Sequence, residues 1–200
     1  MKLPLKFYTH NNVVGIARNL LGKYLFTKID GVITGGYIVE TEAYNGIIDK
    51  ASHAYGGRQT PRTQTMYLQG GVSYVYLCYG IHQMFNIVTS NHGEPHAVLV
   101  RAIVPTDGVE EMLLRRNMAM PKPNLTSGPG SVARALGISG RTNAVDLNGD
   151  VVWLEDRGLS FTDDEVKAVP RVGVDYAGDD ALLPYRFFVM GNPYVSKPNK

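Results

Sequence analysis

The sequence has few of the features that mark disulfide-bonded, secreted or membrane proteins. Its 200 residues include one cysteine, Cys78, which excludes an internal disulfide and a cysteine-based zinc site. No apolar run approaches the roughly 20 residues that a membrane helix needs, and the N-terminus lacks the apolar segment of a signal peptide. We therefore expect a cytoplasmic protein with no membrane association.

A strong net charge is also absent, but the charged residues are unevenly spread. The formal net charge is +2. Residues 50–145 hold nine Lys or Arg against four Asp or Glu, whereas residues 146–180 hold three against ten. This asymmetry indicates one basic face that would suit an anionic partner. Ordinary surface variation explains the same counts equally well, since stretches of sequence need not be faces of a fold.

The composition is that of a globular protein with a sizeable core. Hydrophobic residues make up 44% and charged residues 19%, which suits a single domain over residues 1–200. Apolar periodicity predicts helices near residues 11–21, 108–117 and 131–136. Alternating or apolar runs predict strands in KYLFTKI, GGYIVETEAY, GVSYVYLCY, MFNIVTS, HAVLVRAIVP, VVWLED, RVGV and YRFFVM.

This order of elements predicts an α+β domain. We expect a curved, largely antiparallel β-sheet, surrounding helices and a protruding β-hairpin. The tail at residues 196–200 is expected to fray, because chain ends are poorly ordered unless something holds them.

Two acidic residues and a tyrosine share one face of the strand predicted in VETEAY. Glu40, Glu42 and Tyr44 alternate there with Thr41 and Ala43. A carboxylate at the end of a strand, beside a long loop, is well placed to act as a general base. A solvated sheet face with ordinary glutamates explains the pattern more simply when it is taken alone.

The loop over residues 45–62 has few apolar residues and many turn formers, which is typical of a functional loop. It holds His53, two glycines, Arg58, Thr60 and Arg62. Glycines let a backbone approach a ligand closely, and arginines and hydroxyls contact phosphates. Such loops are common, so this composition by itself is weak support for a binding site.

The stretch YVYLCYGIHQMFN predicts a hairpin with an unusual tip. Tyr74 and Tyr76 share a strand face, and the alternation breaks at Tyr79 and Gly80. Tyr79 and Ile81 then flank the turn, where polar residues are usual. Apolar tips of this kind can be pushed between base steps of a DNA duplex. They can also pack onto a neighbouring element, which is the commoner arrangement.

Several motifs occur in one order along the chain. They are VETEAY, HAYGGRQTPR, YVYLCYG with the later Asn86, VLVRAIVP, SGPG, RVGV and PYRFFVMGNPYVS. With this ordered set, the sequence resembles the alkyladenine DNA glycosylase family, also called the 3-methyladenine DNA glycosylases of the mammalian type. The resemblance extends from about residue 17 to residue 196.

The resemblance implies a monofunctional DNA glycosylase of base excision repair. Such an enzyme flips alkylated or deaminated purines out of duplex DNA and hydrolyses the N-glycosidic bond, which leaves an abasic site. The implied substrates are 3-methyladenine, 7-methylguanine, ethenoadenine and hypoxanthine. No lysine stands in the matching pocket motifs to form a Schiff base, so we expect no lyase activity.

The resemblance also implies roles for the matching catalytic residues. Glu42 would activate the water that attacks the sugar C1′, and Glu40 would support it. Arg101 would hold the water and the sugar–phosphate. The carbonyl group of Val172 would be a further partner of the water.

Further matching residues would bind the flipped base and the DNA. Tyr44, His53 and Tyr76 would enclose the base, and Asn86 would exclude normal guanine, whose exocyclic amino group would clash. The expected contacts with the duplex are intercalation by Tyr79 and Ile81 and backbone binding by Arg58, Thr60, Arg62 and Ser127. Two positions depart from the pattern, because Ser131 stands where relatives can carry a phosphate-binding lysine and His82 follows Ile81.

We expect double-stranded DNA containing damaged purines as the partner, no metal or other cofactor, and a monomer that is nucleoid-associated if bacterial. One alternative is a non-catalytic relative that binds damaged DNA. Another is a metal-dependent hydrolase with ligands drawn from His53, His92, His96, Glu42 and Asp49. Gly93 and Pro95 preclude a helix that would align His92 with His96. An unrelated small-molecule enzyme would leave the ordered motifs unexplained.

Overall fold

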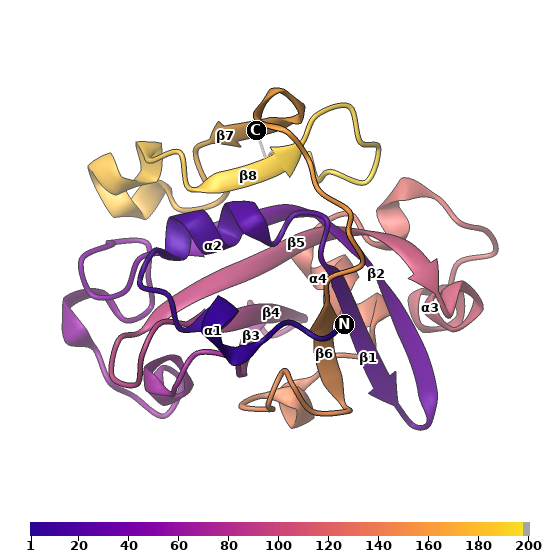
Figure 1. The fold of residues 1–200 in the computed structure, drawn as a ribbon, viewed down its shortest axis with the longest axis horizontal. Helices are drawn as coiled ribbons and strands as arrows, with labels where there is room; N and C mark the ends of the chain where they lie inside the picture. Colours follow the sequence, from indigo (N-terminus) through magenta and orange to yellow (C-terminus); the bar gives the residue numbers. More distant parts are fainter. Residues whose placement is uncertain (198–200) are drawn as a thin grey trace.

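The computed structural model describes residues 1–197, and it is built on one eight-stranded sheet (Figure 1). The strands are β1 (Tyr24–Ile29), β2 (Val32–Tyr44), β3 (Ser73–Cys78), β4 (His82–Thr89), β5 (His96–Asp107), β6 (Val152–Glu155), β7 (Val166–Val169) and β8 (Arg186–Val189). Six of them follow the order β3-β4-β5-β2-β1-β6, while β8 pairs with β2 and β7 pairs with β8. All these pairings are antiparallel. The predicted α+β class is confirmed.

Short helices connect and cover the strands. The α-helices are α1 (Leu5–Tyr8), α2 (Val13–Asn19), α3 (Val109–Arg116) and α4 (Pro129–Ala135). The 3₁₀ turns are η1 (Tyr55–Gly57), η2 (Gln64–Tyr67), η3 (Pro123–Leu125), η4 (Gly140–Thr142), η5 (Asp163–Glu165) and η6 (Asp175–Leu182). The three predicted helices are present as α2, α3 and α4. Within residues 1–197, none of the helices has the length and apolar character needed to cross a membrane.

Strand β2 is the longest strand and organises the sheet. Its first half pairs with β1, and residues 40–42 pair with β8, while β5 runs along its other edge. A Cβ atom at Gly36 would overlap the carbonyl oxygen of Val104, so glycine is needed where β2 and β5 approach. The change of partner from β1 to β8 brings the C-terminal part of the chain beside VETEAY.

The two faces of β2 have different neighbours. Thr41 faces α2, where its hydroxyl donates a hydrogen bond of 2.8 Å to the carbonyl oxygen of Ala17. Asn12 caps α2, since its side-chain oxygen accepts a hydrogen bond of 2.8 Å from the amide of Gly15. Helix α4 packs against β4 and β5 and lies on the other side of the sheet from α2 (Figure 1). The acidic residues of β2 therefore point toward the side of α4.

Two local predictions are wrong. The RVGV segment is no strand: β7 ends at Val169, and residues 171–174 form an irregular bend with Gly173 at φ 74°. Pro170 lacks an amide proton for a ladder bond, which favours the end of the strand there. Ser196 does not fray, because it is 7% exposed and bonded to Glu40. Residues 198–200 of the predicted frayed tail lie outside the described residues.

Candidate active site

A cavity of about 900 Å³ opens between the sheet, the start of α4 and the C-terminal segment. This volume lies within the range of small-molecule sites. The predicted residues that line it are Glu42, Tyr44, His53, Arg62, Tyr76, Tyr79, Asn86, Arg101, Ser127 and Val172. The structure therefore brings together residues that lie up to 130 positions apart in the sequence.

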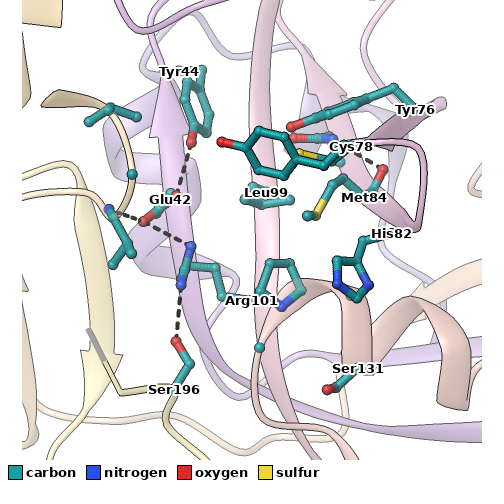
Figure 2. Close-up of a pocket in the computed structure, with 18 of the residues that line it drawn as sticks. Glu42, Tyr44, Tyr76, Cys78, His82, Met84, Leu99, Arg101, Ser131 and Ser196 are labelled. Carbon is teal, nitrogen blue, oxygen red and sulfur yellow. Dashed lines mark hydrogen bonds and ion pairs between the residues drawn. The ribbon is translucent and has the colours of Figure 1, made fainter. Parts of the chain in front are cut away.

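Glu42 lies at the buried end of this cavity, with none of its surface exposed. Its Oε1 atom lies 3.2 Å from a terminal nitrogen of Arg101 and accepts a hydrogen bond of 2.8 Å from the amide of Val172. Its Oε2 atom accepts a hydrogen bond of 2.9 Å from the hydroxyl of Tyr44 (Figure 2). Three donors from three parts of the chain fix the carboxylate, which rules out a solvated sheet face. At Val172 it is the amide, not the carbonyl, that contacts Glu42.

Arg101 connects Glu42 to a second carboxylate. It is 6% exposed, and its Nε atom donates a hydrogen bond of 2.9 Å to Glu40. A terminal nitrogen donates to the hydroxyl of Ser196 at 3.1 Å (Figure 2). Burial acts to lower the pKa of the Arg101 guanidinium, but the charges of Glu42 and Glu40 outweigh burial and raise it. Arg101 is therefore a fixed positive charge beside Glu42.

Aromatic rings form the walls of the cavity. Figure 2 shows Tyr44 beside Glu42 and Tyr76 across the cavity from both. His53 packs edge-on against Tyr76, with ring centroids 4.7 Å apart. Asn86 is 3% exposed, and its amide nitrogen donates to the carbonyl oxygen of Tyr74 at 3.2 Å. Flat walls of this kind can stack on a planar ring.

The environment of His53 keeps its imidazole neutral. Burial, followed by the charges of Arg62 and Arg58, lowers the pKa of His53 to about 4. A nitrogen of Arg62 lies 3.3 Å from Nε2, and the hydroxyl of Tyr74 lies 2.9 Å from Nδ1. A guanidinium can only donate, so Nε2 accepts and Nδ1 carries the proton.

The tip of the β3–β4 hairpin is apolar and exposed, as predicted. Tyr79 is 90% exposed and Ile81 is 73% exposed. The turn is closed by a hydrogen bond of 3.1 Å from the amide of Ile81 to the carbonyl oxygen of Cys78. His82 lies back toward α4, where a Cβ atom added at Gly130 would be 3.0 Å from its Nδ1 atom. Neither tip residue is buried against a neighbouring element, so the commoner explanation for them is excluded.

The predicted backbone-binding residues occupy different surroundings. Arg58 and Thr60 are exposed, and the hydroxyl of Thr60 lies 3.2 Å from that of Thr63. Arg62 turns toward the cavity, with its guanidinium carbon 4.6 Å from the centroid of the Tyr76 ring. Ser127 lines the cavity at the segment before α4. Arg62 and Ser127 therefore line the cavity, whereas Arg58 and Thr60 are not among its lining residues.

Ser131 also lines the cavity, near the start of α4. Its hydroxyl accepts a hydrogen bond of 3.1 Å from Arg116. A cation, Arg116, therefore lies next to Ser131.

Comparison with known proteins identifies the family of the chain. A model of the methylpurine-DNA glycosylases matches residues 6–193. The chain belongs to the methylpurine-DNA glycosylase family. This places it among DNA glycosylases, hydrolases that act on N-glycosyl bonds, and confirms the resemblance.

Bacterial relatives agree with the methylpurine-DNA glycosylase assignment. A protein of Chlamydia pneumoniae is 46% identical over 92% of both chains. A protein of Bacillus cytotoxicus is 43% identical over 98% of this chain and 100% of its own length. A protein of Clostridium acetobutylicum is 42% identical over 98% of both. Each bears the name "Putative 3-methyladenine DNA glycosylase".

Sequence reasoning gave no site role to two residues that bind Glu40 in this methylpurine-DNA glycosylase, of which Ser196 lines the cavity. Arg186 and Ser196 both bond to Glu40, at 2.7 Å and 2.6 Å. A signal for Arg186 was available, since an arginine inside the apolar run YRFFVM must find a partner when it is buried. No local signal marks Ser196.

Two residues of the metal-hydrolase alternative, Asp49 and His53, have other partners. Asp49 pairs with Arg171 at 2.5 Å, and His53 bonds to Tyr74. Among residues 1–197, no group of three His, Cys, Asp or Glu side chains is placed to hold a metal ion.

Proposed function

We propose that this methylpurine-DNA glycosylase flips alkylated or deaminated purines out of duplex DNA and hydrolyses the bond to the sugar. The observation that carries the proposal is Glu42, a buried carboxylate held by three donors at the end of a cavity with aromatic walls. Water is then the nucleophile, and Glu42 is its general base. We propose that the enzyme acts as a monomer in the cytoplasm, at the nucleoid if it is bacterial.

The hydrolysis requires one base for the water and one negatively charged group that stabilises the positive charge on the sugar. Glu42 takes a proton from water while the oxygen attacks C1′, and the bond from C1′ to the purine nitrogen breaks with its electron pair on the base. The sugar passes through an oxocarbenium-like state, which a carboxylate beneath it stabilises. Arg101 and the Val172 segment orient Glu42 and the water. Nothing in this step requires an additional nucleophile.

The cavity walls account for how an extruded base would be held. Flipping costs a few kcal/mol, and each stacked base returns roughly 1–3 kcal/mol. Tyr44 and Tyr76 supply the faces, and neutral His53 adds no charge that would repel a cationic alkylpurine. Tyr79, with Ile81 beside it, would fill the space left in the duplex. Arg58, Thr60, Arg62 and Ser127 would contact the phosphates.

The proposed substrates share a purine skeleton but differ in charge. 3-Methyladenine and 7-methylguanine are cationic in DNA and would be attracted to the aromatic faces. Ethenoadenine and hypoxanthine are neutral and would rely on stacking and on a lower cost of unpairing. Asn86, which lines the cavity, would exclude the amino group of normal guanine.

An excision panel tests the proposal. Purified protein is incubated with duplex oligonucleotides that carry one of the four lesions, under single-turnover conditions, and abasic sites are counted after alkaline cleavage. We expect excision of at least one lesion. Glu42→Gln should lower the rate by more than 100-fold while duplex binding changes little, because the base is lost but the cavity is kept. Glu110→Gln, an exposed position on α3, is the matched control.

The same assay separates the proposal from its alternatives. Tight binding of lesion DNA without cleavage would indicate the non-catalytic relative.

The expected absence of lyase activity needs its own test, because Lys197 lines the cavity and a lyase forms a Schiff base through a lysine amine. Borohydride should trap no covalent adduct, and a trapped adduct would show that the enzyme is bifunctional.

A further inference from the structure

Four charged side chains form a buried cluster behind the cavity. Glu40 and Glu42 have no exposed surface, Arg186 is 4% exposed and Arg101 is 6% exposed. Two carboxylates and two guanidinium groups balance in charge. Buried ions are stable only when they are paired, so each member depends on the others.

Glu40 is the centre of this cluster. Its Oε1 atom accepts hydrogen bonds from Nε of Arg101 at 2.9 Å, Nε of Arg186 at 2.7 Å and the hydroxyl of Ser196 at 2.8 Å. Its Oε2 atom accepts from the amide of Ser196 at 2.6 Å. Arg186 also donates to the carbonyl oxygen of Ser196 at 3.0 Å. The C-terminal segment is thereby fixed to the strand that carries Glu42.

The two arginines divide their contacts unequally. Arg101 contacts both carboxylates, through Nε to Glu40 and through a terminal nitrogen to Glu42. In the part of the chain that the structure describes, the ion pair of Arg186 is with Glu40. Without Arg186, two buried carboxylates would share one arginine, and protonation of one of them would be favoured.

We propose that Arg186 is a positioning residue that neutralises Glu40, so that the charge of Arg101 is left to hold Glu42 as a carboxylate. This rests on the proposed function, in which Glu42 must be ionised to accept a proton from water. Arg186 is not expected to touch the substrate. Its effect reaches the reaction through Glu40 and Arg101.

Other charged and titratable groups around Glu42 must be taken into account. Tyr44 contacts it from β2, Arg101 from β5, and Arg171 acts on it from the segment after β7. His53 lies across the cavity with a pKa near 4 and therefore ionises at acidic pH. All of these groups stay unchanged in variants of the Glu40–Arg186 pair.

The test is the pH dependence of excision by the full-length protein. Single-turnover rates on one hypoxanthine duplex are measured for wild type, Arg186→Met, Glu40→Gln and the double variant. Arg186→Met removes a positive charge and should move the midpoint of the acid limb up by about one pH unit. Glu40→Gln removes a negative charge and should move the midpoint down. The double variant restores the charge balance, so its midpoint should return to that of wild type. Arg186→Lys keeps the charge and should stay close to wild type.

The pattern of shifts separates this role from a purely structural one. If the variants lower the rate equally at all pH values and leave the midpoint in place, the inference is wrong. Thermal melts check folding, and if Arg186→Met does not fold, the direction of the Glu40→Gln shift decides. A wild-type protein that excises no lesion would overturn the proposed function itself. Excision by wild type without opposed shifts would overturn only the role of Arg186.

Discussion

At the scale of single residues, His53 shows how burial and charge together set the state of one side chain. Its pKa falls to about 4 from the ordinary value of 6.5, because burial and then the charges of Arg62 and Arg58 oppose protonation. The imidazole is therefore neutral near pH 7. A neutral ring beside Tyr76 is compatible with a cationic base in the cavity, whereas an imidazolium would repel it.

The shift makes stability depend on pH. The unfolded chain binds a proton at His53 near pH 6.5, while the folded chain does so only near pH 4. Stability from this group is thus complete above pH 6.5 and is lost as the pH falls toward 4, by up to about 3 kcal/mol. Urea unfolding of wild type and His53→Gln measures this loss as a difference that shrinks with falling pH. A constant difference from pH 7 to pH 4 would contradict it. His92→Gln, on an exposed turn, is the control.

At the scale of elements, the β3–β4 hairpin keeps an unfavourable backbone at its tip. Tyr79 has φ 50° and Gly80 has φ 74°, so both residues lie in the left-handed region. A left-handed conformation costs a residue with a Cβ atom about 1 kcal/mol, and Asn-Gly would form the same turn with less strain. Strain retained at an exposed aromatic residue is consistent with the wedge that we propose.

Tyr79→Asn should therefore separate stability from function. We expect a rise of about 0.5 kcal/mol in the free energy of unfolding, because Asn tolerates the left-handed region. We also expect a weaker fluorescence rise from 2-aminopurine placed beside hypoxanthine, because no aromatic ring would hold the duplex open. An unchanged flipping signal would refute the wedge. Leu114→Asn, an exposed apolar position on α3, is the matched control.

At the scale of the whole molecule, one buried ion pair joins distant parts of the chain. Arg171 binds both oxygens of Asp49, 122 residues away, at 2.5 and 2.8 Å. It also donates to the carbonyl oxygen of Ala43, and its guanidinium lies 4.9 Å from the ring of Tyr44. Asp49 accepts the amide of Asn45 in addition. The pair fixes the loop over residues 45–62, the end of β2 and the segment after β7 as one unit.

Breaking this pair should destabilise the entire domain. Asp49→Ala leaves the buried Arg171 without a counter-charge, which typically costs about 3–5 kcal/mol. Chemical denaturation followed by circular dichroism measures the loss. Asp150→Ala removes the exposed partner of Lys2 and should leave the unfolding midpoint unchanged. A loss at Asp49 below about 1 kcal/mol would mean that water replaces the missing carboxylate.

Local sequence patterns predicted most elements because their causes are local. Alternation in VETEAY placed Glu40, Glu42 and Tyr44 on one face, and the cap at Asn12 marked the start of α2. The strand predicted over RVGV is absent, because an apolar run forms a strand only where the backbone of a neighbouring strand is free to pair with it. In RVGV, the backbone amide of Val172 donates to the carboxylate of Glu42 instead.

The sequence by itself determined the α+β class, the antiparallel hairpins, the exposed apolar tip and, through its ordered motifs, the family. Only the tertiary structure decided that Glu42 is buried, that the amide of Val172 holds it, and that Arg186 and Ser196 bind Glu40 behind it. The reason is physical. Periodicity records which face a residue takes within its own strand, whereas burial and pairing of charges depend on which distant segment packs against that face. Here β8 replaces β1 beside β2, and no local pattern encodes that exchange.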